Sequence, residues 1–465
     1  MSGVAAPGWR DLIGGGNASR SLVIAGGVAV HALSIYVVVT IMPLVVAELG
    51  GLAFFAWTAT LYIAGSLCGA ASIPLLLSRA GPRFAYGLAF GLFMLGSLVC
   101  ALAPDMAALL VGRIVQGVGG GMLPSLGYAT VRSLFPAHLH ARAIALLGSV
   151  WGIAALLGPT LGGVVAQFGG WRWGFGIDLP IALLFAVLAN RVVPRAIEAV
   201  APRPFPGLRL LLLAAAAIAV SAGGLTGRPV PVAIGVATAV ALVLAMLRID
   251  GRASRRMLPR GAFNPATPIG AVSATLALLI LTTSPCNFVA LILRTGHGAA
   301  PIVGGYVSAL LALSWTVASL LTAAVGRAGA RATIVVAPLL MLAGLLLHAW
   351  ALAPGLMPAI VAAQLLVGAG IGLAWAHLGA LLMRVTPAAD RDLAGPFLSL
   401  TQTLAAAFGS AIAGLAANAA GLAAATTPAA VAAVAPGLFA GLSLSAVAAS
   451  LAGWRTLRLT RFQPS

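Results

Sequence analysis

This sequence of 465 residues has little charge, since only 7% of its residues are charged. Soluble domains carry about 25% charged residues, so this chain lacks the polar groups needed to cover a globular surface in water. Hydrophobic residues make up 61% of the chain, and its mean hydropathy is +1.09. These values exclude a soluble globular protein and predict a surface that faces lipid.

Lysine is absent, and the eight acidic residues are outnumbered by 26 arginines, which leaves a formal net charge of +18. A strongly basic balance can indicate a nucleic-acid partner. Here the arginines form no patch and stand in the short gaps between apolar runs. We therefore expect no nucleic-acid partner, and the spacing is typical of loops in a protein embedded in a lipid bilayer.

Cysteine is also scarce. Cys68, Cys100 and Cys286 all lie inside apolar runs, and an odd, buried set does not form a disulfide framework. His138 and His140 stand on a loop without a nearby carboxylate or cysteine, so no metal site is predicted. The motifs of a metalloprotease or a serine hydrolase are missing, which argues against an integral membrane enzyme. No cofactor is expected.

Long apolar runs dominate what is present. A membrane-spanning helix needs about 20 apolar residues, and 14 runs meet this need. They cover about residues 21–44, 54–77, 84–104, 107–130, 142–167, 174–193, 208–226, 229–247, 267–293, 301–325, 332–352, 356–383, 393–421 and 430–454. The first is too long for a signal-peptide core. The seventh and eighth could instead form a re-entrant or interfacial hairpin, but the absence of charge within them favours true spans.

The arginines orient these spans, because cytoplasmic loops of membrane proteins are enriched in Arg and Lys. With a cytoplasmic N-terminus, 22 arginines fall on the inside, three fall outside (Arg172, Arg228 and Arg294), and Arg113 lies within a span. We therefore predict a multi-pass protein of the bacterial inner membrane with both termini in the cytoplasm.

The two ends of the chain repeat each other. A short basic loop at 78–83 follows the second span, and a similar loop at 326–331 follows the tenth. The fourth span carries Arg113 followed by a run of glycines, and the twelfth carries Gln364 followed by glycines at the same spacing. Such repeats are a hallmark of secondary transporters.

The fold class predicted from this repeat is an all-α membrane protein. We expect a six-helix half at 1–193, a linker with two inserted helices at 194–266 and a second six-helix half at 267–465. Because two halves can form a pathway within one chain, we expect a monomer.

At these motifs the chain resembles the major facilitator superfamily, and in particular its 14-span drug:proton antiporter branch. The matching residues are Arg79, Gly81 and Arg83 in the first basic loop, Arg113, Gln116, Gly117 and Gly119 in the fourth span, and Gly158, Pro159, Gly162 and Gly163 in the fifth. Three positions depart from the family: Ser78 replaces an aspartate, Ser34 stands at an often acidic position, and Asp178 replaces an asparagine.

The resemblance implies an exporter of the multidrug-efflux type, which carries a small amphiphilic molecule by alternating access in antiport with protons. The loop signature and the fifth-span motif would then take part in the conformational change. Two alternatives stay open within transport: a facilitated uniporter, or an exporter of a specific anionic or neutral metabolite without proton coupling. A channel and a membrane enzyme are the alternatives from other classes.

Arg113 is the one arginine well inside a span, and burying it costs about 2.5–3.5 kcal/mol on insertion scales. It must therefore face protein or a water-filled cavity. Either it binds backbone carbonyls of a neighbouring helix as a structural residue, or it takes part in proton coupling or substrate contact, together with Gln116.

Seven of the eight acids are expected in loops or tails, and only Asp178 reaches a span, at its outer end. We therefore expect any proton to be carried by Asp178, His31 or His377, although a lone histidine more often serves in hydrogen-bonded packing. A positive Arg113 without a deep carboxylate favours a neutral or anionic substrate. The further candidates for the cavity lining are polar or aromatic: Ser34, Tyr36, Tyr62, Trp151, Asn287, Trp315, Trp375 and Gln402.

Overall fold

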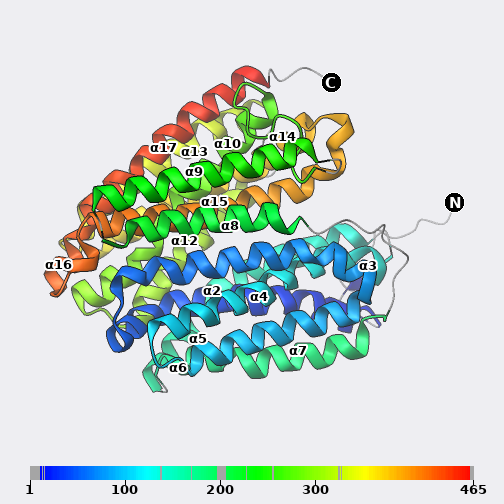
Figure 1. The fold of residues 1–465 in the computed structure, drawn as a ribbon, viewed down its shortest axis with the longest axis horizontal. Coiled ribbons are helices and arrows are strands. Elements are labelled where there is room, and N and C mark those ends of the chain that lie inside the picture. Colours follow the sequence, from blue (N-terminus) through cyan, green and yellow to red (C-terminus); the bar gives the residue numbers. More distant parts are fainter. Residues whose placement is uncertain are drawn as a thin grey trace. The chain divides into compact units, whose positions relative to one another are not determined.

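Helices form all the regular secondary structure that the computed structural model describes (Figure 1). The described residues are 11–12, 14, 16–136, 139–168, 170–195, 206–226, 228–253, 256–322, 325 and 327–460. Within them, eleven helices are long and apolar enough to cross a membrane, and Ser149–Val165 and Gly207–Gly223 are shorter apolar helices. The expectation of an all-helical protein is confirmed.

Eleven is fewer than the 14 spans expected from the sequence, for two reasons. The second and third predicted spans run together as one candidate, Leu52–Ala101, and two others correspond to the shorter apolar helices. The number 14 therefore stays a prediction.

The chain divides into two compact units, the first being Met1–Ile41 with Leu61–Gly207 and the second Met42–Thr60 with Leu208–Ser465. The helices assigned mainly to the first unit are α2 (Asn17–Leu49), α3 (Phe55–Ala101), α4 (Met106–Leu134), α5 (His140–Phe168), α6 (Arg172–Gly176) and α7 (Asp178–Val192). Tyr86, Phe90 and Phe93 of α3 pack with Met122 of α4 in a core whose members are almost wholly buried.

The basic loop of the first unit is a sharp bend within α3. Gly81 has φ 77° and ψ 168°, a conformation that is essentially restricted to glycine. Arg83 follows the bend and donates from Nε to the carbonyl oxygen of Val193 at 2.9 Å. This bond satisfies a carbonyl at the carboxyl end of α7, where a cation is favoured. Of the other signature positions, Arg79 is exposed and Ser78 bonds locally to the Leu75 carbonyl.

The second unit comprises a pair of helices, α8 and α9, and the helices that follow them. Its elements are α8 (Gly207–Gly223), η3 (Gly224–Thr226), α9 (Pro229–Arg252), α10 (Pro268–Thr283), η4 (Ser284–Phe288), α11 (Val289–Leu291), the π-helix η5 (Ile292–Gly296), α12 (Pro301–Thr322), α13 (Arg327–Ala351), α14 (Met357–Val385), η6 (Ala388–Leu393), α15 (Ala394–Ala419), η7 (Leu422–Ala424), α16 (Pro428–Ala432) and α17 (Val434–Leu459), with η1 (Leu52–Phe54).

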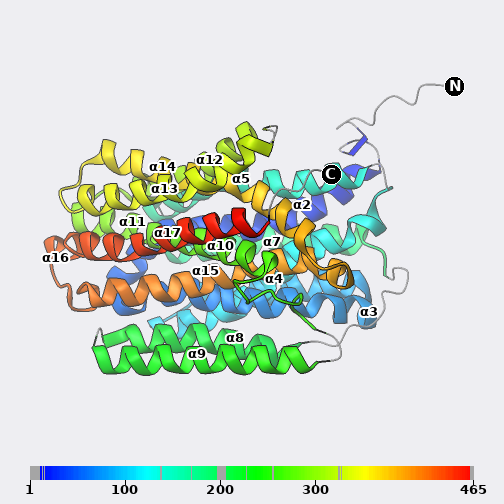
Figure 2. The same cartoon turned by 90° about the horizontal axis from the view of Figure 1, so that it is seen from above.

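The inserted pair α8 and α9 lies side by side (Figures 1 and 2), because Gly223 and Gly235 let the two backbones approach closely. A Cβ on Gly223 would lie 3.0 Å from the Cα of Gly235. At the other end of the pair, the buried Asp250 accepts from Arg209 at 2.7 Å and from the backbone N–H of Met257 at 2.7 Å. Apolar residues of α8 and α9 also share a core cluster with α15. The pair is thus part of the second unit.

Glycines on two faces of α4 let α3 approach from both of its arms. A Cβ on Gly117 would meet the backbone of Tyr62, which precedes the Gly81 bend, whereas one on Gly119 would meet the backbone of Phe93, which follows it. Gly121, one turn beyond Gly117, likewise faces the first arm. A side chain at any of these positions would push a neighbouring helix away.

In the second unit, α14 is packed in the same alternating way. A Cβ on Gly368 would meet Leu311 of α12, and a Cβ on Gly372, one turn later, would meet Trp315 of the same helix. Gly370, on the other face, would meet Met341 of α13. The glycine spacing noticed in the sequence therefore corresponds to the same kind of close helix packing in each unit.

We expect Gly117→Ala to lower the thermal unfolding temperature of the purified protein, because overpacking a close contact costs about 1–3 kcal/mol. The matched control is Gly91→Ala, also within a helix, where an added Cβ would meet nothing within 4 Å. That variant should be neutral or slightly stabilising. Equal unfolding temperatures for the two variants in detergent would contradict the packing described above.

Candidate functional site

A buried polar cluster lies within the first unit, where α2, α3, α4 and α7 meet. Its members have at most 3% of their surface exposed, and they are Ser34, Ser97, Arg113, Gln116 and Asp178. Polar groups in an apolar bundle must find hydrogen-bond partners, since an unpaired group costs several kcal/mol in lipid. The contacts within the cluster provide these partners.

Gln116 lies at the centre of this cluster. Its side-chain amide nitrogen is 2.8 Å from Ser97 Oγ, 3.1 Å from Ser34 Oγ and 3.1 Å from Asp178 Oδ2. Its carbonyl oxygen accepts a hydrogen bond from the guanidinium of Arg113. Arg113 and Gln116 stand three residues apart on α4, a spacing that puts both on one helix face. One amide thus connects a cation on α4 to a carboxylate on α7.

Local sequence places these groups. Gly96 lacks a side chain, so the backbone of α3 lies against Gln116 and brings the neighbouring Ser97 within reach of its amide. Asp178 is the first residue of α7, where the positive end of the helix dipole favours an acidic side chain. The cluster therefore depends on one close helix contact and one helix start.

Arg113 also links the cluster to an aromatic group. Its guanidinium lies 4.0 Å from the centre of the Tyr62 ring, a favourable cation–π geometry. The Tyr62 hydroxyl is 2.8 Å from Nδ1 of His31, and His31 packs edge-on against Trp151 at 5.7 Å between ring centres. Gly120 makes room for this pair, since a Cβ there would lie 3.0 Å from His31 Nδ1. One connected network thus contains seven of the residues predicted from the sequence: His31, Ser34, Tyr62, Arg113, Gln116, Trp151 and Asp178.

Asp178 is more completely buried than its place near the end of a span suggested. We expected it at the outer end of its span, but it is 3% exposed and shares the Gln116 amide with Ser34, a residue midway along α2. Asp178 is the seventh residue of the candidate span Arg172–Val192, close to its expected place, and its burial comes from the helices packed around it. The structure therefore places a buried carboxylate within a candidate span, linked to Arg113 through Gln116.

The fifth-span motif packs against α2. A Cβ on Gly158 would meet Tyr36, which is half-buried, and one on Gly162 would lie 3.1 Å from the side chain of Thr40. Pro159 lies inside α5, and Gly163 is buried. These residues form a close contact between two helices, and their part in a conformational change remains a prediction.

The other predicted cavity residues belong to the second unit. His377 of α14 places Nε2 3.1 Å from the Thr322 carbonyl oxygen, and Trp315 packs edge-on against Trp375 at 5.6 Å between ring centres. The remaining two, Asn287 on η4 and Gln402 on α15, are exposed. Asn287 stands out because its neighbours in η4 are buried.

Sequence reasoning missed several buried polar residues. Ser97 is central to the cluster, but a single serine in an apolar run carries no signal by itself. In the second unit, neither amide atom of the wholly buried Gln364 has a hydrogen-bond partner among the described residues, nor has Nε2 of the buried His348. The repeat did single out Gln364, because it stands where Arg113 stands in α4.

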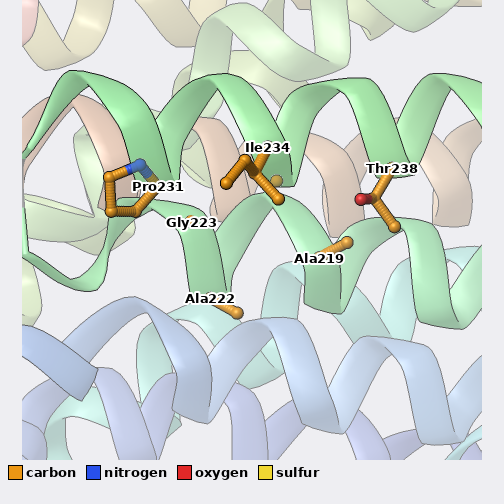
Figure 3. Close-up of a pocket in the computed structure, with 7 residues that line it drawn as sticks. Ala219, Ala222, Gly223, Pro231, Ile234 and Thr238 are labelled. Atoms are coloured by element: carbon orange, nitrogen blue, oxygen red, sulfur yellow. The ribbon is translucent and has the colours of Figure 1, made fainter.

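The groove between α8 and α9 is a different kind of feature (Figure 3). It measures about 370 Å³ and is lined by Ala219, Ala222, Gly223, Pro231, Ile234, Gly235 and Thr238. Thr238 carries the one polar side chain of this lining, so the groove offers nothing to bind a charged group. No group of metal-binding side chains occurs among the described residues, while His138 lies outside them.

Comparison with known proteins places the chain in a family. The Major Facilitator Superfamily profile matches residues 24–410, which is most of the sequence. The chain belongs to the Major Facilitator Superfamily. It is therefore a multi-pass membrane transporter and not an enzyme, as the sequence predicted.

Curated relatives support this assignment along the whole chain. A probable multidrug-efflux transporter of Mycobacterium tuberculosis is 34% identical over 474 residues, covering 98% of each protein. Multidrug resistance protein 3 of Bacillus subtilis is 31% identical over 186 residues, which covers 39% of this chain and 36% of that protein.

Solved structures share the fold. The peptide transporter PepTSo superposes with a TM-score of 0.69 at 15% identity, covering 96% of this chain and 99% of that one. A D-xylose–proton symporter gives 0.65 at 19% identity, covering 94% and 97%. At such identities the likeness concerns the fold alone.

If the network couples Arg113 to Asp178, the two residues should show non-additive effects on the stability of the transporter. We expect Arg113→Gln to lower the unfolding temperature strongly, since removing one buried charge and leaving the other costs about 3–5 kcal/mol. Adding Asp178→Asn should then recover part of that loss. The measurement is thermal unfolding of the two single variants and the double variant.

The control cycle pairs Asp178→Asn with Arg20→Gln, since Arg20 bonds to the Leu134 carbonyl at the far end of α4. Effects in that cycle should add, as is usual for distant sites. Additive effects for Arg113 and Asp178 as well would contradict the coupling.

Proposed function

We propose that this protein is a secondary active transporter that exports a small amphiphilic molecule across the bacterial inner membrane by alternating access, in exchange for protons. The observation that carries the proposal is the buried Asp178, whose carboxylate bonds to Gln116 and so connects to Arg113. The M. tuberculosis relative described as a probable multidrug-efflux transporter supports export of drug-like compounds.

Asp178 is our choice for the proton carrier. Ionisable residues inside membrane spans are costly and are typical of proton and substrate pathways. A carboxylate that faces opposite sides of the membrane in two conformations can bind a proton on one side and release it on the other. His31 and His377 are weaker choices, because neither bonds to the Gln116 amide; their partners are the Tyr62 hydroxyl and the Thr322 carbonyl respectively.

For the architecture, we infer two six-helix halves at 1–193 and 267–465 with two inserted spans in the linker 194–266, as in the 14-span drug:proton antiporter branch. The alternating glycine contacts of α4 and α14 support an internal repeat. The arginine distribution supports cytoplasmic termini. A monomer suffices, because both halves lie in one chain.

The close contacts of α5 are the proposed moving parts. Gly158 and Gly162 lie against Tyr36 and Thr40 of α2 and place no side chain of their own in the contact, and Pro159 removes a backbone hydrogen bond that would stiffen α5. Gly81 would act as the hinge of α3, and the hydrogen bond from Arg83 to the Val193 carbonyl would hold α3 to the end of α7. Helices that touch through glycine can slide or tilt with little steric cost.

Proton coupling predicts uphill transport in proteoliposomes under an imposed pH gradient, and this accumulation should collapse with a protonophore. Asp178→Asn should abolish the dependence on the gradient, whereas His31→Ala and His377→Ala should retain it. Retained pH-driven accumulation in the triple variant of Asp178, His31 and His377 would refute all three carriers. Transport that merely equilibrates the compound, whatever the gradient, would support the uniporter alternative.

The charges of the cluster also restrict the substrate. Arg113 stays protonated at any physiological pH, so the pair of Arg113 and Asp178 carries either no net charge or one positive charge. We therefore expect neutral and anionic amphiphiles to be accumulated at least tenfold more than quaternary ammonium dyes in the same proteoliposomes. Strong uptake of such dyes would count against this substrate class.

A further inference from the structure

The amide nitrogen of Gln116 lies near more hydrogen-bond acceptors than it has N–H groups. It carries two N–H groups, but three oxygens lie within hydrogen-bond distance: Ser97 Oγ at 2.8 Å, Ser34 Oγ at 3.1 Å and Asp178 Oδ2 at 3.1 Å. Hydrogen bonds to a charged acceptor are roughly twice as strong as neutral ones. Asp178 therefore accepts a hydrogen bond from one N–H while it is ionised, and the two serine oxygens compete for the other N–H.

We propose that Gln116 is the positioning residue that transmits the proton state of Asp178 to α2 and α3, an inference that rests on the proton coupling proposed above. When the carboxylate binds a proton, one O–H bond forms and the negative charge disappears. The Gln116 amide then loses its strongest acceptor, and its two N–H groups can bond to Ser34 and Ser97 together. When the proton leaves, the bond to Asp178 returns.

The three acceptors sit on three different helices, so this exchange has a mechanical effect. Ser34 is on α2, Ser97 on the second arm of α3 and Asp178 at the start of α7. Protonation weakens the link from α4 to α7 and strengthens the links from α4 to α2 and α3. A single amide thereby converts the charge of one carboxylate into a change of helix contacts.

Arg113 holds the amide in the orientation that this exchange requires. A guanidinium has only donors, so the Gln116 oxygen must face Arg113 and its nitrogen must face the three acceptors. The reversed amide would bring an oxygen against the carboxylate and N–H groups against the guanidinium. Arg113 therefore keeps the donors of Gln116 directed at Asp178.

Other titratable side chains near the cluster already have partners of their own. Tyr62 and His31 bond to each other, and the Cys100 thiol lies 3.5 Å from the Leu109 carbonyl oxygen. The exchange thus involves Asp178 as the titrating group and Arg113 as the fixed charge.

The test is infrared difference spectroscopy of the full-length protein in lipid during a pH titration, with the C=O stretch of a protonated carboxyl group as the readout. The parent protein should show a titrating band that disappears in Asp178→Asn. Gln116→Leu should raise the midpoint of this band by about one to two pH units, which is the size expected for loss of a hydrogen bond to a charged group. An unchanged midpoint would overturn the inference.

The matched control is Gln364→Leu, which replaces a buried glutamine of α14 at the position that corresponds to Arg113. It should leave the midpoint of the band unchanged. A shift caused merely by the loss of any buried amide would appear in this variant as well. If Gln116→Leu does not fold, Gln116→Met removes the same donors with a side chain of closely matched shape. A shift in Gln364→Leu equal to that in Gln116→Leu would also overturn the inference.

A second test moves the carboxylate. Because Ser34 and Asp178 both lie 3.1 Å from the same nitrogen, the double variant Ser34→Asp/Asp178→Asn should regain a titrating carboxyl band that Asp178→Asn alone has lost. Adding Gln116→Leu to this double variant should again raise the midpoint. If the double variant folds but shows no titrating band, the inference fails.

The outcomes also separate the two proposals. A parent protein without any titrating band from Asp178 would defeat the proposed proton carrier. If the band titrates in the parent and its midpoint is the same in both Gln116 variants, the proposed proton carrier stands and only the role of Gln116 is refuted.

Discussion

Burying the guanidinium of Arg113 among apolar helices costs about 2.5–3.5 kcal/mol on insertion scales, and the first unit is arranged to offset this cost. Gln116 accepts from the guanidinium, Tyr62 presents its ring to it, and Asp178 supplies an opposite charge through the Gln116 amide. Each of these partners needs a particular helix to be close. The positions of α3, α4 and α7 in this unit are therefore tied to the compensation of one charge.

Close approach of the helices depends in turn on glycine. The missing side chain of Gly96 leaves space for Gln116, that of Gly117 for the backbone of Tyr62, and that of Gly120 for the pair of Tyr62 and His31. A methyl group at any of these positions would separate the partners of the cluster as well as the helices. The glycines thus serve packing and chemistry together, which is why a bundle with so little charge can still hold a connected polar network.

Much of this could be predicted from the sequence. Apolar runs of about 20 residues indicate helices wherever they occur, so the all-helical fold followed from composition and length. Arg113 stood out because an arginine inside such a run is costly. The motif around Gln116 and the acid at Asp178 singled out two further members of the cluster, and the spacing of Gly368, Gly370 and Gly372 indicated a repeat.

Hydrogen-bond partners could not be predicted in this way, because they come from helices far apart in the chain. The contact of Gln116 with Ser34, Ser97 and Asp178 depends on how α2, α3 and α7 are rotated about their axes. Ser97 carried no local signal, and the burial of Asp178 depends on the helices packed around it. The sequence by itself determined that long apolar helices dominate the chain and that the charge of Arg113 must be compensated among them. Only the tertiary structure decided which side chains compensate that charge, because helix rotation and packing bring them together.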